Sequence, residues 1–133
     1  MKLIKRTGLA LLFLPVILIL IFILYEFIGM CVNHSATRQQ TMKLRTNLEN
    51  EIPDITIVDV YSETGNTSGT GNHVDCLSAV TFSTQMQESE IKNSMSEYYE
   101  FDEWSCYLDK TDGGNYLFYL NVPAPFENNI EGH

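Results

Sequence analysis

The C-terminal two thirds of this chain are short of basic residues. The sequence has 17 acidic and 8 basic residues, and after residue 48 it keeps all but one of the acids and only two bases, Lys92 and Lys110. A surface with such an excess of negative charge repels nucleic-acid phosphates and anionic lipid headgroups. We therefore expect no nucleic-acid partner for this region.

The chain also lacks the residue patterns of common catalytic and cofactor sites. It contains no CxxC or HExxH spacing for zinc and neither the Walker nor the dinucleotide-binding glycine pattern. No serine lies in a nucleophile elbow. We therefore assign no catalytic residue, no metal and no cofactor, and a non-catalytic protein is favoured over an enzyme.

What the chain does have is one long apolar run near its N-terminus. From Leu9 to Leu24 every residue is Leu, Ile, Val or Phe except Ala10 and Pro15, and the run is free of charge. As a helix, residues 7–25 would be about 28 Å long, close to the thickness of the hydrocarbon core of a bilayer. The run predicts a transmembrane helix that contacts membrane lipid through residues 7–32.

The flanks of this run predict an uncleaved signal-anchor with its N-terminus in the cytoplasm. Lys2, Lys5 and Arg6 form a dense basic cluster before it, whereas the bases after it are sparser and spread over residues 38–45. The run is longer than the core of a cleaved signal peptide, and no small-x-small cleavage site follows it. The remainder of the chain would then lie outside the cytoplasm.

The sequence divides into five segments. They are a basic N-terminal segment (1–6), the signal-anchor (7–32), a juxtamembrane helix or stalk (33–53), a small α+β domain (54–126) and a C-terminal tail expected to be loose (127–133). In the third segment Leu44, Leu48 and Ile52 fall four apart on one helical stripe, and Pro53 ends the helix. The stripe fits either a stalk that continues the span or a helix that lies on the domain.

The domain is predicted to be of αββαββ type, with an antiparallel sheet and helix packed on one face. The expected strands are 55–61, 73–82, 104–109 and 116–122, with a glycine-rich loop at 62–72, a helix at 86–99 and a hairpin turn at 112–115. The helix residues Ile91, Met95 and Tyr98 should be buried against Val80, Phe118 and Leu120. Most aromatic residues should form core, but any on an open sheet face would suit contact with protein or glycan.

One candidate site stands out, in the glycine-rich loop and the strand that follows it. Its residues are Gly69, Gly71, Asn72, His73 and Asp75. The backbone amides of such a loop can hold an anion, and His73 and Asp75 alternate onto one face of a strand, where both could reach one metal ion. However, no lysine and no helix N-terminus follow the loop. A mobile hairpin connection is therefore the simpler interpretation.

Two cysteines suggest a disulfide. Cys76 and Cys106 both fall on the more apolar face of an expected strand, and Cys31 lies apart at the membrane boundary. If the two strands were neighbours, the Cα atoms could come within the ~4.4–6.8 Å that a bridge needs. A bridge between Cys76 and Cys106 is expected, with two free buried thiols as the alternative.

The predicted function is that of a single-pass, membrane-anchored, extracytoplasmic interaction or accessory module. Its partner would be another membrane or envelope protein. The alternative is a membrane-anchored enzyme or metal-binding sensor centred on the glycine-rich loop, His73 and Asp75. A pocket that gathers histidine, acid and cysteine would favour the alternative, and an exposed apolar patch or a free strand edge would favour the module.

Overall fold

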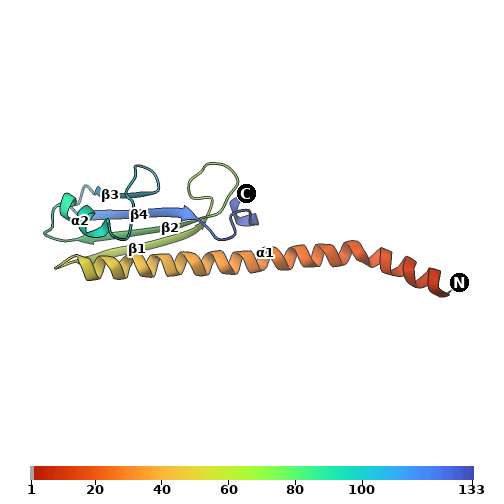
Figure 1. Cartoon of the computed structure of the whole chain (residues 1–133). Helices are drawn as coiled ribbons and strands as arrows, with labels where there is room; N and C mark the ends of the chain where they lie inside the picture. Colours follow the sequence, from red (N-terminus) through yellow and green to blue (C-terminus); the bar gives the residue numbers. More distant parts are fainter. Residues whose placement is uncertain (1) are drawn as a thin grey trace.

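The computed structural model describes residues 2–133, and side-chain surroundings from residue 13 onward. The elements follow in the order α1 (Lys2–Glu51), β1 (Thr56–Gly65), β2 (Asp75–Ser83), α2 (Glu88–Met95), β3 (Cys106–Lys110), β4 (Tyr116–Pro123) and η1 (Ile130–Gly132). The order confirms the predicted αββαββ arrangement of an α+β fold. Figure 1 shows α1 lying along the sheet with its C-terminal half and projecting beyond the domain with its N-terminal half.

The sheet has four antiparallel strands in the order β1-β2-β4-β3. Val60 in β1 pairs with Val80 in β2, and Val80 pairs on its other side with Phe118 in β4. Phe118 in turn pairs with Leu108 in β3. The two predicted hairpins, β1–β2 and β3–β4, are therefore confirmed, and they join through their inner strands.

Helix α1 combines the two alternatives considered for residues 33–53. It continues the apolar run as one helix, and its C-terminal half lies on the domain. Leu44, Leu48 and Ile52 are buried in the core, which places this part of the helix on the domain. Ile52 donates its N–H to the carbonyl of Leu48, and Pro53, which has no N–H to donate, follows it. The same stripe continues toward the N-terminus with the buried polar residues Thr41, Thr37 and Asn33.

The polar part of the stripe holds α1 to the sheet by hydrogen bonds. Gln40 donates to the carbonyl of Cys76 at 2.9 Å and to the hydroxyl of Ser78 at 3.1 Å. The Thr41 hydroxyl lies 2.7 Å from that of Ser78, and the Thr37 hydroxyl lies 2.7 Å from that of Thr64. Buried polar groups are costly unless paired, so these bonds select one register of the helix on the sheet.

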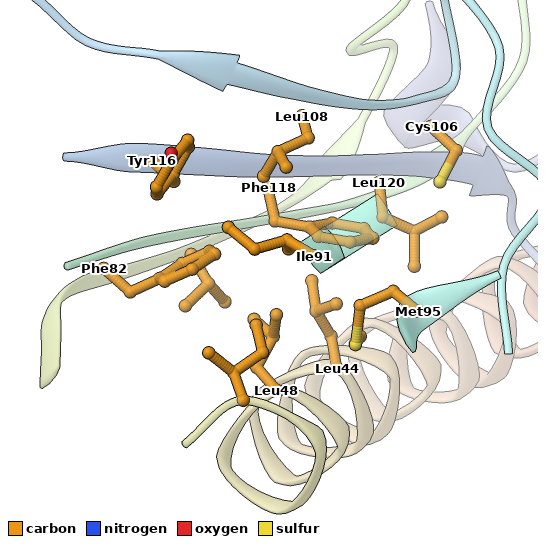
Figure 2. Close-up of a cluster of buried hydrophobic side chains, with 12 residues drawn as sticks. Leu44, Leu48, Phe82, Ile91, Met95, Cys106, Leu108, Tyr116, Phe118 and Leu120 are labelled. Carbon is orange, nitrogen blue, oxygen red and sulfur yellow. The ribbon is translucent and has the colours of Figure 1, made fainter. Parts of the chain in front are cut away.

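The apolar core lies between the sheet and the two helices, which cover the same face. Leu44 and Leu48 from α1 and Ile91 and Met95 from α2 meet Phe118 and the other inward side chains of β2, β3 and β4, as Figure 2 shows. The predicted burial of Ile91 and Met95 is confirmed.

The prediction for Tyr98 is wrong. Helix α2 ends at Met95 rather than Tyr99, so Tyr98 lies in the turn that follows and is 43% exposed. Its hydroxyl donates to the carboxylate of Glu51 at 2.7 Å. Periodicity placed this residue on the apolar face of a helix that does not extend so far.

The C-terminal tail is not loose but packs on α1. Asn33 donates to the carbonyl of Phe126 at 3.0 Å and accepts from its N–H at 2.9 Å. The buried side chain of Asn129 donates to the Glu26 carboxylate at 2.9 Å, and the N–H of Ile130 donates to the same oxygen. Glu26, which follows the apolar run, thus holds the end of the chain.

The predicted disulfide between Cys76 and Cys106 is wrong, since both residues are free thiols. Strand β4 lies between β2 and β3, which places the two Cα atoms about two strand spacings apart, roughly 10 Å. A bridge cannot span that distance. The thiols also point into different clusters, Cys106 into the main core and Cys76 into a small one with Val74 and Ala124.

Replacing Met95 by Asp should abolish cooperative unfolding of the domain, because it puts an unpaired carboxylate into the core. Replacing Met95 by Ala should cost about 2–5 kcal/mol. Thermal unfolding of the full chain in detergent, followed by near-ultraviolet circular dichroism, measures both. Asn93→Asp, on the exposed side of α2, is the matched control and should leave the midpoint within a few degrees. A normal transition in Met95→Asp would contradict this assignment of the core.

Without reductant, the denatured chain should take up three alkyl groups, one at each of its three cysteines. The folded chain should take up only one, at the exposed Cys31. Burial raises the pKa of the Cys106 thiol to about 11, with a smaller contribution from nearby Asp102, and this protonated thiol is a poor nucleophile. Mass spectrometry counts the adducts. If two thiols of the denatured chain reacted only after reduction, Cys76 and Cys106 would form a disulfide after all.

Candidate functional site

The glycine-rich loop joins β1 to β2 and begins later in the chain than expected. Strand β1 runs on to Gly65, so the loop begins at Asn66. The Asn66 side chain donates to the carbonyl of Gly71 at 2.7 Å, which ties the loop across its base. Gly69 and Gly71 have φ values of 68° and 69°, a conformation that favours glycine. They form the exposed crest of the loop together with Asn72.

The structure brings two of the predicted site residues together with a serine that was not singled out. The Nε2 atom of His73 lies 3.2 Å from the Asp75 carboxylate and 3.2 Å from the Ser68 hydroxyl. The N–H of Ser68 donates to the second carboxylate oxygen of Asp75, also at 3.2 Å. Asp75 is buried, and the Ser68 N–H gives its carboxylate a hydrogen bond where it has little access to water.

This cluster contains the residue types of a catalytic triad but not its geometry. In a triad the acid holds one imidazole nitrogen while the other nitrogen faces the serine, so that the ring can take the serine proton. Here Asp75 and Ser68 share the single Nε2 atom. No third histidine, cysteine or acid joins His73 and Asp75 to make a metal-binding group among the described residues. The arrangement suits a structural tie between the loop and β2.

A more open surface adjoins this cluster and was missed in the sequence. His73 and Asp75 line one side of a cleft of about 420 Å³ whose other side is formed by Trp104, Tyr119 and Asn121. A second cleft, of about 600 Å³, shares Trp104 and Tyr119 with the first, and its lining also includes Tyr107. Trp104 is shared by the two clefts and is 83% exposed.

The cleft of about 420 Å³ opens on the sheet face that points away from the helices, here called the outer face. The cleft of about 600 Å³ lies along the edge strand β3, and its lining combines residues of the outer face with Lys92 of α2. Side chains alternate along a strand, so Tyr119 points outward where its neighbours Phe118 and Leu120 point into the core. Tyr119 stacks on Tyr107 of β3, with ring centroids 4.5 Å apart and planes at 14°. In residues 2–133 both helices that pack on the sheet lie on its other side.

The loop that carries Trp104 is held rigidly by Asp102. One oxygen of its carboxylate accepts the backbone N–H groups of Trp104, Ser105 and Cys106, at 2.7, 2.5 and 3.0 Å. The other oxygen accepts the hydroxyl of Ser105. These hydrogen bonds lower the pKa of the Asp102 carboxyl far below its usual range, with the Ser105 hydroxyl as the largest cause. The carboxylate is therefore ionised at neutral pH and accepts all of these hydrogen bonds.

Around Trp104 the surface combines neutral phenols with carboxylates. Burial raises the pKa of both Tyr107 and Tyr119; the former is raised further by Tyr119 and Asp109, the latter by Asp75 and Glu63. Both phenols are thus uncharged hydrogen-bonding groups at neutral pH. The cleft of about 600 Å³ also includes Asp102, Glu103 and Asp109 in its lining.

Sequence reasoning placed Trp104 inside the third strand, where its alternation with Cys106 and Leu108 suggested core. Strand β3 begins only at Cys106, so Trp104 belongs to the loop before it. The polar run Asp102-Glu103 directly before the tryptophan was the available signal, because an aspartate can accept from the backbone N–H groups that follow it and form a turn.

Comparisons of the chain with models of protein families, with curated proteins and with solved structures find no match.

Proposed function

We propose that this protein is a single-pass membrane protein that presents its α+β domain outside the cytoplasm as a non-catalytic interaction module for another membrane or envelope protein. The outer face is its docking surface. The observation that carries the proposal is the 83% exposure of Trp104 on a loop that Asp102 holds in place. Large exposed aromatic residues are enriched at protein interfaces and often supply much of their binding energy.

The anchor in this proposal is the projecting half of α1, the one helix among the described residues that is long and apolar enough to span a membrane. From Phe13 to Leu24 its large side chains are about half exposed or more on every side of the helix, for example Phe13 at 51% and Leu20 at 60%. A helix that is apolar all round needs an apolar surrounding, and lipid supplies it.

Contacts of the C-terminal segment with α1 support a membrane surface near Tyr25 and Glu26. Tyr25, at the end of the apolar run, packs edge-on against Phe126, with ring centroids 5.8 Å apart. The hydrogen bonds to Glu26 satisfy its carboxylate close to where the span would end. An aromatic pair and a paired acid are compatible with the interfacial layer of a bilayer, whereas an unpaired acid would be costly deeper in it.

The alternative, an enzyme or metal-binding sensor centred on His73 and Asp75, has one observation in its favour, which is the contact of both residues with Ser68. The shared Nε2 atom argues against proton relay, and two ligands are fewer than zinc requires. Loss of biological activity in a well-folded His73→Ala protein would favour this alternative over the module.

The proposed topology predicts that a cysteine placed in the hairpin turn reacts from outside the cell. In a Cys31→Ser background, Asp112→Cys should be labelled by a membrane-impermeant maleimide on intact cells. Lys5→Cys, on the basic side of the span, should be labelled only after permeabilisation. The two remaining native cysteines are buried and should stay silent. The reverse pattern would place the domain in the cytoplasm.

Photo-crosslinking tests the docking surface. A benzoylphenylalanine at position 104, in cells that carry the full chain, should give a discrete adduct with one protein. The same residue at position 42 is the matched control, because Met42 is also well exposed, at 61%, but lies on α1 away from the sheet. Tyr119→Ala should weaken the adduct at position 104. The proposal fails if no discrete adduct forms there, or if position 42 gives the same one.

A further inference from the structure

We propose that the outer face recognises a basic segment of its partner, and that the cleft of about 600 Å³ beside Trp104 binds an arginine or lysine side chain of that segment. This rests on the proposed function and adds the chemistry of the partner. It follows from three features of the cleft, namely its aromatic walls, the sign of its charges and the rigidity of the loop that carries Trp104.

The aromatic walls provide faces for a cation. Trp104 is open to solvent on the loop, and Tyr107 and Tyr119 line the same cleft. The face of an indole or phenol ring attracts a guanidinium or ammonium group, and tryptophan attracts it most strongly. The chain already shows this contact elsewhere, since the Lys110 ammonium lies 5.7 Å from the centre of the Tyr116 ring.

The charges in the cleft have the opposite sign to the proposed ligand. Asp102, Glu103 and Asp109 are exposed and belong to its lining. Lys92 also belongs to the lining, but its ammonium group is already paired with Glu88 at 2.6 Å. Asp102 is already hydrogen-bonded within the Trp104 loop, so Glu103 and Asp109 supply the negative charge next to the aromatic faces. This combination selects a cationic side chain over a neutral or acidic one.

The charge of the whole domain points to the same class of partner. The full chain has a net charge of −9, and nearly all of its acids lie beyond residue 48. Such a field attracts a basic segment from a distance and repels a second copy of the same domain and the headgroups of anionic lipids. The rigid Trp104 loop then reduces the conformational entropy that binding would cost.

The test is a titration of the full chain, in non-ionic polyoxyethylene detergent, with triarginine amide. Trp104 is the only tryptophan, so tryptophan fluorescence reports on the surface around this residue. We expect a saturable change, and binding about ten-fold weaker or more for tricitrulline amide, which has a similar shape but no charge. Asp109→Asn should weaken binding about three- to five-fold, because it removes one exposed charge pair.

Two variants separate the cleft from the general acidity of the domain. Asp112→Asn removes an equal charge from the exposed turn after β3, outside the cleft, and should change the affinity less than two-fold. Trp104→Ala, followed by calorimetry because the fluorophore is lost, should abolish measurable binding, while Trp104→Phe should retain part of it.

Several outcomes would overturn the inference. Equal effects of Asp109→Asn and Asp112→Asn would show that the peptide follows only the net charge. Equal binding of the citrulline peptide would remove the role of the cation. A saturable change with neutral cellopentaose but not with triarginine would identify a sugar-binding face instead. If triarginine fails while position 104 still crosslinks to a protein, only the basic chemistry of the partner is wrong and the proposed function stands.

Discussion

The packing of the C-terminal half of α1 against the sheet is the contact on which the rest of the structure depends. Leu44 and Leu48 supply the apolar part of this contact, and Gln40 and Thr41 supply its hydrogen bonds. Without the helix, the inward face of the sheet would expose Phe82, Phe118 and the other core residues to water. Because the same helix runs on without a break into the apolar segment, this packing also sets the direction in which the domain is held.

Polar ties extend that contact toward the N-terminus. Asn33 and Phe126 exchange two hydrogen bonds, and Glu26 accepts from Asn129 and Ile130. They join the last residues of the chain to the part of α1 where the apolar run ends. The domain is therefore held along α1 from Glu26 to Leu48, which leaves little freedom for it to tilt on its helix.

The two faces of the sheet differ in what covers them. The inner face is closed by α1 and α2 and carries the stability of the fold. The outer face remains open, and its aromatic residues are arranged by strand alternation, by the Tyr107–Tyr119 stack and by the turn at Asp102. An exposed aromatic surface of this kind is the reason that we propose the outer face as the docking surface.

Much of the fold could be predicted from local patterns. The apolar run, the stripe from Leu44 to Ile52, the helix stop at Pro53 and the turn at residues 112–115 each depend on neighbouring residues alone, and the structure contains all of them as elements or ends of elements. The class and the element order follow from these. Strand β1 ended later than expected and α2 earlier, because pairing with β2 overrides the polar composition of residues 62–65 and the turn after Met95 overrides helical periodicity.

What only the tertiary structure decided were the relations between segments distant in the sequence. The insertion of β4 between β2 and β3 separates Cys76 from Cys106, and no feature of either strand announces it. The tail is ordered because Glu26 and Asn33, about a hundred residues away, satisfy its polar groups. Likewise, the sequence predicted that His73 and Asp75 lie on one face of a strand. It did not predict that Ser68 joins them, or that a single imidazole nitrogen makes both contacts. Local sequence determines what each segment can form, whereas long-range pairing determines which faces are covered and so which side chains stay exposed.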